Sequence, residues 1–169
     1  MSANDIQVYS TGDETTGRQG YRCNITAATF VEGEPVAIDG SNEIDICATD
    51  PATVLGIAVE PAVSKSSRMA ALETADTTRI VDIPAPDKLY MTRNFSTAAA
   101  GTDAVPTAAL VVGAAGNFIQ NAGTLVWSFG TGGGNANLVG VAVLDDDGFN
   151  IQDELSPSGA GEWVVFRFA

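Results

Sequence analysis

The chain has 169 residues, with 21 Asp and Glu against 8 Lys and Arg, a formal net charge of −13 and no histidine. Its 45% of hydrophobic residues are enough to form a buried core, which excludes wholesale disorder. The acidic balance argues against a nucleic-acid-binding surface, because affinity for phosphates comes mainly from Lys and Arg. The missing histidine removes the commonest general base and metal ligand, so the composition favours a protein that is not an enzyme.

The composition also indicates the fold class. Val, Ile and Thr are abundant, and their β-branched side chains suit strands better than helices. The 18 Gly and 7 Pro are scattered along the chain, which is typical of many short strands joined by loops. We therefore expect an all-β protein.

The first residues lack the basic and apolar regions of a signal peptide, and no apolar run is long enough to cross a bilayer. Without an export signal, the two cysteines, Cys23 and Cys47, are expected as reduced, buried thiols rather than as a disulfide.

Residues 1–22 are predicted to form an extended N-terminal arm. They contain few apolar side chains, so the arm is either a frayed terminus or held on a partner. Residues 23–169 are predicted to form one β-rich domain.

Strand-like runs begin after residue 23 and are separated by turn residues. Asp39 and Gly40 form a hairpin-type turn signal, and residues 53–59 are nearly all apolar, as expected for a strand covered on both faces. The other runs in the first half of the chain are residues 30–31, 35–38, 44–47, 67–73, 77–83 and 89–95.

Residues 94–135 are predicted to be a long, irregular Ala/Gly-rich insertion. Glycine and proline interrupt every helical window there, which favours loops and a hairpin that turns at residues 114–116. Trp127 and Trp163 lie in apolar strands and are expected in the core. With the runs 124–129, 138–144, 149–152 and 162–168, about ten short strands predict a single β-barrel or β-sandwich domain.

Two pentapeptides echo each other, at residues 55–59 and 139–143, and each has a glycine at its second position. Glycine inside a strand often marks a bend or a close backbone approach. The echo predicts equivalent strands of one barrel.

The charge is unevenly distributed along the chain. Residues 23–64 carry seven acids and no base, residues 65–93 carry five bases and four acids, and residues 94–169 carry seven acids and one base. The middle segment is therefore either locally balanced or a surface that meets an acidic partner. Together with the arm it supplies the candidate contacts with a partner or another subunit: Ile6, Val8, Tyr9, Arg18, Lys65, Arg68, Arg79, Lys88 and Arg93.

Two clusters resemble ligand sites. Asp145, Asp147 and Asp153 are a weak Ca²⁺ candidate, because their spacing does not fit an EF-hand and a solvated turn explains them as well. Residues 130–135 are glycine-rich but lack the Lys-Ser/Thr of a phosphate loop, which favours a flexible hairpin loop. No catalytic constellation and no cofactor site is indicated.

Residues 32–38 (EGEPVAI) and 50–60 (DPATVLGIAVE) resemble the small β-rich head decoration, or cement, proteins of tailed bacteriophages. Those proteins similarly set a Gly-x-Pro-Val strand before a Leu/Val-Gly-Ile/Val-Ala strand. Residues 138–142 (LVGVA) repeat the second signature.

The resemblance implies a structural virion protein that binds the outer surface of an assembled capsid and braces contacts between major capsid subunits. It implies the major capsid protein as partner, a homotrimer or other homo-oligomer, assembly in the host cytoplasm, and no role for nucleic acid, membrane or cofactor. The alternatives are a carbohydrate-binding or adhesive β-domain on a virion or cell surface, and a glycan-cleaving enzyme with two facing acids.

Overall fold

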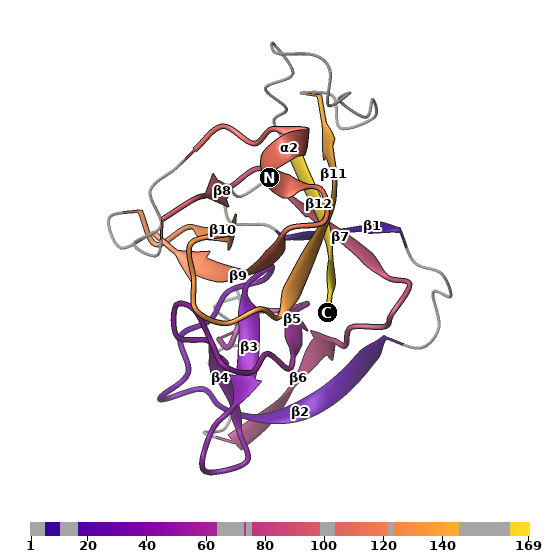
Figure 1. Ribbon diagram of the computed structural model, residues 1–169. Coiled ribbons are helices and arrows are strands. Elements are labelled where there is room, and N and C mark those ends of the chain that lie inside the picture. Colours follow the sequence, from indigo (N-terminus) through magenta and orange to yellow (C-terminus); the bar gives the residue numbers. More distant parts are fainter. Residues whose placement is uncertain are drawn as a thin grey trace. The chain divides into compact units, whose positions relative to one another are not determined.

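The protein is described by a computed structural model that covers residues 6–10, 17–63, 73, 76–98, 104–121, 124–145 and 163–169 (Figure 1). The described chain forms twelve strands in two sheets and one short helix, so the predicted all-β class is confirmed. The predicted strands at residues 149–152 and, apart from Glu73, 67–73 lie outside the described residues.

The larger sheet has seven strands in the order β1-β7-β12-β11-β9-β10-β8. All neighbouring strands are antiparallel except β10 and β8, which run parallel. The strands are β1 (Gln7–Ser10), β7 (Leu89–Thr92), β8 (Phe95–Ser96), β9 (Ala115–Gln120), β10 (Trp127–Gly130), β11 (Leu138–Leu144) and β12 (Trp163–Phe168).

One face of the larger sheet carries an aromatic core. Phe166 lies at its centre, with its ring centroid 5.9 Å from that of Tyr90, 5.8 Å from that of Phe118 and 5.7 Å from that of Phe129. Trp127 packs edge-on against Phe118 and is fully buried. Because Trp163 is also buried, both tryptophans are core residues, as predicted.

The smaller sheet has five antiparallel strands in the order β2-β6-β5-β3-β4. They are β2 (Arg18–Asn24), β3 (Pro35–Ile38), β4 (Ile44–Ile46), β5 (Gly56–Ala58) and β6 (Asp76–Asp82). Each strand contributes to one apolar core, which contains Cys23, Val36, Ile44, Ala58 and Val81.

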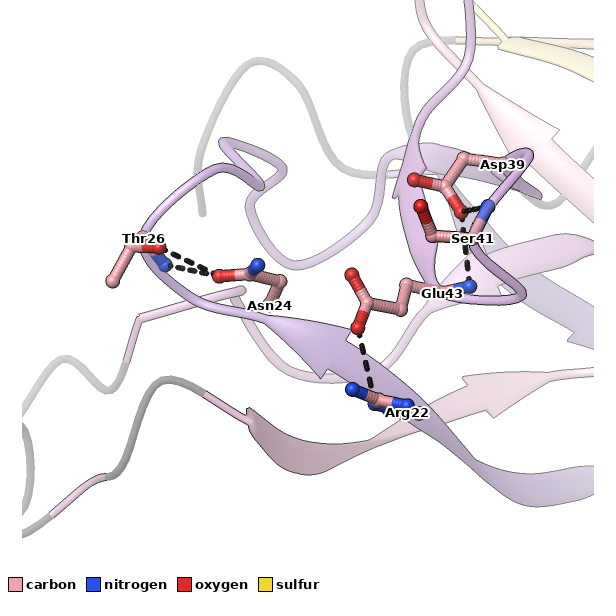
Figure 2. A network of polar contacts seen from close by, with 6 residues as sticks. All are labelled: Arg22, Asn24, Thr26, Asp39, Ser41 and Glu43. Atoms are coloured by element: carbon pink, nitrogen blue, oxygen red, sulfur yellow. Dashed lines mark hydrogen bonds and ion pairs between the residues drawn. The ribbon is translucent and has the colours of Figure 1, made fainter.

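The two outer strands of the smaller sheet, β2 and β4, lie next to each other, so this sheet curls toward a closed barrel. Figure 2 shows Arg22 of β2 pointing at Glu43, just before β4, with Nε 3.0 Å from Oε1. The predicted turn at Asp39 is the loop between β3 and β4, where the carboxylate accepts hydrogen bonds from the N–H groups of Ser41 and Glu43 (Figure 2).

The two sheets belong to two compact units, and the chain passes between them more than once. Residues 13–47 and 53–84 form the smaller unit, while residues 1–12, 48–52 and 85–169 form the larger one. The division into an arm of residues 1–22 and a domain of residues 23–169 remains a prediction. The described residues of the first segment lie in β1 and β2 of the two sheets.

Residues 94–135, predicted to be an irregular insertion, contribute β8, β9, β10 and the helix α2 (Ala108–Val111) to the larger unit. The hairpin predicted to turn at residues 114–116 is absent among the described residues, because its first arm is α2 and β9 begins at Ala115. Small residues have a packing role here. A Cβ on Gly116 would lie 2.6 Å from Cζ of Phe129, so the strand glycine makes room for the ring.

The two echoing pentapeptides fall in different sheets, Gly56 in β5 and Gly140 in β11, so they are not strands of one barrel. The prediction of a close backbone approach is confirmed at both. A Cβ added to Gly56 would lie 2.2 Å from the carbonyl oxygen of Asp82. A Cβ added to Gly140 would lie 2.0 Å from the carbonyl oxygen of Val111.

Candidate functional site

Two of the predicted cationic contacts are buried in their own units. The Arg79 side chain donates from Nε to the carbonyl of Ala62 over 2.9 Å, and its guanidinium also pairs with Glu73. Lys88 is buried with Nζ 5.7 Å from the centroid of the Tyr90 ring. Both cations therefore make their contacts within their own units, and their role in a capsid or subunit contact stays a prediction.

Two other predicted cations are exposed. Arg18 lies at the start of β2, and Arg93 follows β7 with its guanidinium carbon 4.5 Å from the centroid of the Trp163 ring. Lys65 and Arg68 lie outside the described residues.

The predicted apolar contacts of the arm lie in or beside β1. Ile6 is buried, and Val8 and Tyr9 belong to the strand itself. Backbone pairing of β1 with β7 therefore holds this stretch in the larger sheet.

Of the weak Ca²⁺ candidate, only Asp145 is among the described residues, directly after β11. Asp147 and Asp153 lie outside them. Within the described ranges, no three His, Cys, Asp or Glu side chains are grouped so that they could hold a metal ion.

In the larger unit, Asp50 accepts hydrogen bonds from three different residues through its side chain. Its Oδ2 accepts a hydrogen bond from the N–H of Gly134 over 2.8 Å. Its Oδ1 accepts from Nδ2 of Asn117 over 2.8 Å and from the N–H of Asn135 over 3.2 Å. We refer to these residues, together with Pro51 and Asn137, as the Asp50 cluster.

The backbone of Asp50 takes part as well. Its φ is +51°, a left-handed conformation that Asp adopts more readily than most residues. Its N–H donates to the carbonyl of Phe118, and its own carbonyl accepts from Nδ2 of Asn135 over 2.8 Å. The carbonyl of Pro51 accepts from Nδ2 of Asn117 over 2.9 Å.

A second asparagine completes the Asp50 cluster. Nδ2 of Asn137 donates to the carbonyl of Pro51 over 2.6 Å and to Oδ1 of Asn117 over 3.2 Å. Oδ1 of Asn117 also accepts from the N–H of Phe118, so this buried amide bonds through both of its polar atoms. The cluster therefore ties residues 48–52 to β9 and to the loop after β10.

These hydrogen bonds favour the charged form of the carboxylate. The N–H of Gly134 is the main cause that lowers the pKa of Asp50 below its ordinary value, with the amide of Asn117 and the N–H of Asn135 acting in the same direction. Partial burial opposes them. Asp50 is thus an ionised carboxylate that fixes the backbone of residues 134–135.

The glycine-rich residues 130–135 do not form the predicted hairpin loop. They follow β10 and lead to β11, and these two strands do not pair because β9 lies between them. A Cβ on Gly133 would lie 2.4 Å from Oδ1 of Asp50, so glycine lets the loop pass close to the carboxylate. Sequence reasoning missed this contact, although the asparagines at 135 and 137 were the available signal.

Both cysteines are free and buried, as predicted. Burial raises the pKa of the Cys23 thiol to about 11 and that of the Cys47 thiol to about 12. Both therefore remain protonated, unreactive thiols near neutral pH.

Two of the three segments that carry the family resemblance contribute strands to the smaller sheet, whereas residues 138–142 lie in β11 of the larger sheet. β3 pairs with β5, with Pro35 opposite Ile57 and Val36 opposite Gly56. Hydrogen bonds continue the pairing beyond the strands, from the N–H of Gly33 to the carbonyl of Ala58 over 2.9 Å.

No helix in the described part of the chain is both long and apolar enough to cross a bilayer. No protein-family model, curated protein or solved structure matches this chain.

Proposed function

We propose that this chain is a structural protein of a tailed-phage virion, which binds the outer surface of the assembled capsid and stabilises contacts between major capsid subunits. The observation that supports the proposal best is the pairing of β3 with β5. Two of the three short motifs that resemble decoration proteins, residues 32–38 and 50–60, lie close together in the sequence, and their strands pair in an antiparallel way. This pairing is compatible with the order of strands that the resemblance implies.

The use of charged side chains to hold loops is compatible with this role. The carboxylate of Asp50 and the guanidinium of Arg79 both bind backbone groups of loops. Such contacts keep loops in one shape, which suits a protein that acts by presenting a fixed surface to a lattice.

The two exposed cations, Arg18 and Arg93, are the remaining basic candidates for the capsid contact among the described residues. A cation in a chain of net charge −13 can approach an acidic patch on a capsid subunit while the rest of the surface is repelled. We expect Arg18→Glu to weaken capsid binding, most clearly at low salt, where charge interactions are least screened.

Co-sedimentation with undecorated capsids of the phage that carries the gene tests the proposal. We expect the protein to pellet with capsids in a saturable way, and to stay in the supernatant with unassembled capsid subunits. Capsids with bound protein should also withstand heating or osmotic shock better than bare capsids. A protein that stays in the supernatant at every capsid concentration would refute the proposal.

A further inference from the structure

One long stretch of this acidic chain has no charge. No Asp, Glu, Lys or Arg occurs from Ala104 to Leu144, between Asp103 and Asp145. In the described chain, this stretch also supplies four of the seven large hydrophobic side chains that are exposed: Val105, Leu110, Val112 and Leu125. The stretch therefore reaches the surface with apolar side chains.

Three of these side chains lie on α2 or close to it in sequence. Val105 is 60% exposed, Leu110 46% and Val112 44%. We call these three residues, with the exposed Ala109, the α2 patch. Outward positions on a short surface helix normally carry polar or charged residues, whereas the outward positions of α2 carry Ala109 and Leu110.

The C-terminal end of α2 is anchored on β11. Val111 is fully buried, and its carbonyl sits where a side chain at Gly140 would be. The N–H of Gly113 donates to the carbonyl of Gly140, and the N–H of Gly140 donates to the carbonyl of Ala114, each over 2.9 Å. A preordered patch loses little conformational entropy when it binds a partner.

We propose that the α2 patch is the surface through which two copies of this chain associate. Two molecules that each carry a charge of −13 repel each other through any acidic face. An uncharged, apolar patch is a surface on which like-charged copies can meet and bury hydrophobic area. A cationic partner would instead be drawn to the acidic faces and would not need this patch.

This inference goes beyond the proposed function, because self-association is measured on the free protein without capsids. A chain that self-associates but ignores capsids would refute only the capsid proposal, and a monomer that binds capsids would refute only this inference.

Sedimentation velocity over a hundredfold range of protein concentration, at low and at high salt, tests the inference. We expect the wild type to self-associate, and more tightly at high salt, since salt screens the remaining repulsion. Leu110→Glu should weaken self-association at least about tenfold, because it removes apolar burial and places like charges at the contact. Val105→Glu should act in the same direction, which covers the case in which one variant folds poorly.

Leu125→Glu is the matched control. Leu125 is 59% exposed and lies in the same uncharged stretch, but in the connection between β9 and β10 rather than at α2. We expect it to associate nearly as well as the wild type. Circular dichroism and thermal melting establish that each variant is folded. A wild type that stays monomeric throughout, folded α2-patch variants that associate normally, or a control that dissociates equally would each overturn the inference.

Discussion

Replacing Asp50 by alanine removes a carboxylate that holds two parts of the chain to residues 48–52. The change deletes the hydrogen bonds from Gly134, Asn135 and Asn117, of which two are 2.8 Å long. Each of the three bonds contributes about 0.7 kcal/mol, in the lower part of the net range for a hydrogen bond, because Asp50 is partly exposed. Alanine at a φ of +51° adds about 1 kcal/mol of strain. We expect Asp50→Ala to lower the free energy of unfolding by about 3 kcal/mol.

Two variants separate the sources of this loss. Asp50→Asn tolerates the left-handed backbone and keeps one acceptor oxygen, so we expect it to cost about half as much. Asp39→Ala also removes a carboxylate that accepts two backbone N–H groups, but in an exposed loop of the smaller unit. We expect that change to cost about 1 kcal/mol or less.

Urea denaturation at pH 7 measures these differences. Tryptophan fluorescence follows the Asp50 variants, because both tryptophans belong to the larger unit, and circular dichroism follows Asp39→Ala in the smaller unit. For a chain of this size, a loss of about 3 kcal/mol corresponds to a fall in Tm of roughly 6–12 °C. If Asp50→Ala were as stable as the wild type, the Asp50 cluster would not stabilise the fold and the reasoning would be refuted.

The lowered pKa of Asp50 fixes the sign of a pH dependence. Its contribution is fully present above the ordinary value of 3.8 and is lost as the pH falls through the lower pKa of the folded state. The stability difference between wild type and Asp50→Asn should therefore be constant near neutral pH and shrink below about pH 4. A difference that grew on acidification would contradict the assigned hydrogen bonds.

Three further changes test other parts of the structure. Arg79→Met should cost about 3–5 kcal/mol in urea denaturation, because it leaves a carboxylate and a carbonyl without their buried cation, and a near-neutral result would contradict the pairing. Gly140→Ala should destabilise by about 2 kcal/mol or more, whereas Gly40→Ala, with no atom within 4 Å of the added Cβ, should be neutral, and equal Tm values would count against the close approach. The thiols of Cys23 and Cys47 should resist a disulfide reagent at pH 8 in the native protein and react fully in urea, so rapid native labelling would argue against their burial.

Local sequence patterns predicted the strands that coincide with a clear apolar run in the sequence. The apolar run at residues 138–144 is β11, and every one of its residues is buried or half-buried, as its composition requires. The helix α2 was missed because its four residues are too short for a helical period, and its place depends on Gly140 in a distant strand. β9 and β10 were partly hidden by glycines, whose role is to leave room for Phe129 and Ile119 across the sheet.

The Asp50 cluster was not predictable in the same way. Its members come from three separate parts of the chain, and the residues around Asp50 do not predict that its partners are Asn117 and Gly134. Asp-Pro and a glycine-rich loop each read as ordinary turns. The loop of residues 130–135 reaches Asp50 only because of the strand order, in which β9 lies between β10 and β11.

The structure also changes which surface the charge distribution indicates. The nearly neutral segment, residues 65–93, is a predicted partner surface because it holds most of the bases. Of those bases, Arg79 neutralises Glu73 within the smaller unit and Lys88 is buried, so for these two residues local balance explains the composition better than an external contact. Exposed and uncharged surface lies elsewhere, at α2, where an acidic chain could have placed acids without strain. Because like-charged molecules repel each other most where acids face acids, the absence of charge at α2 argues for the proposed contact more strongly than the excess of bases in residues 65–93 does.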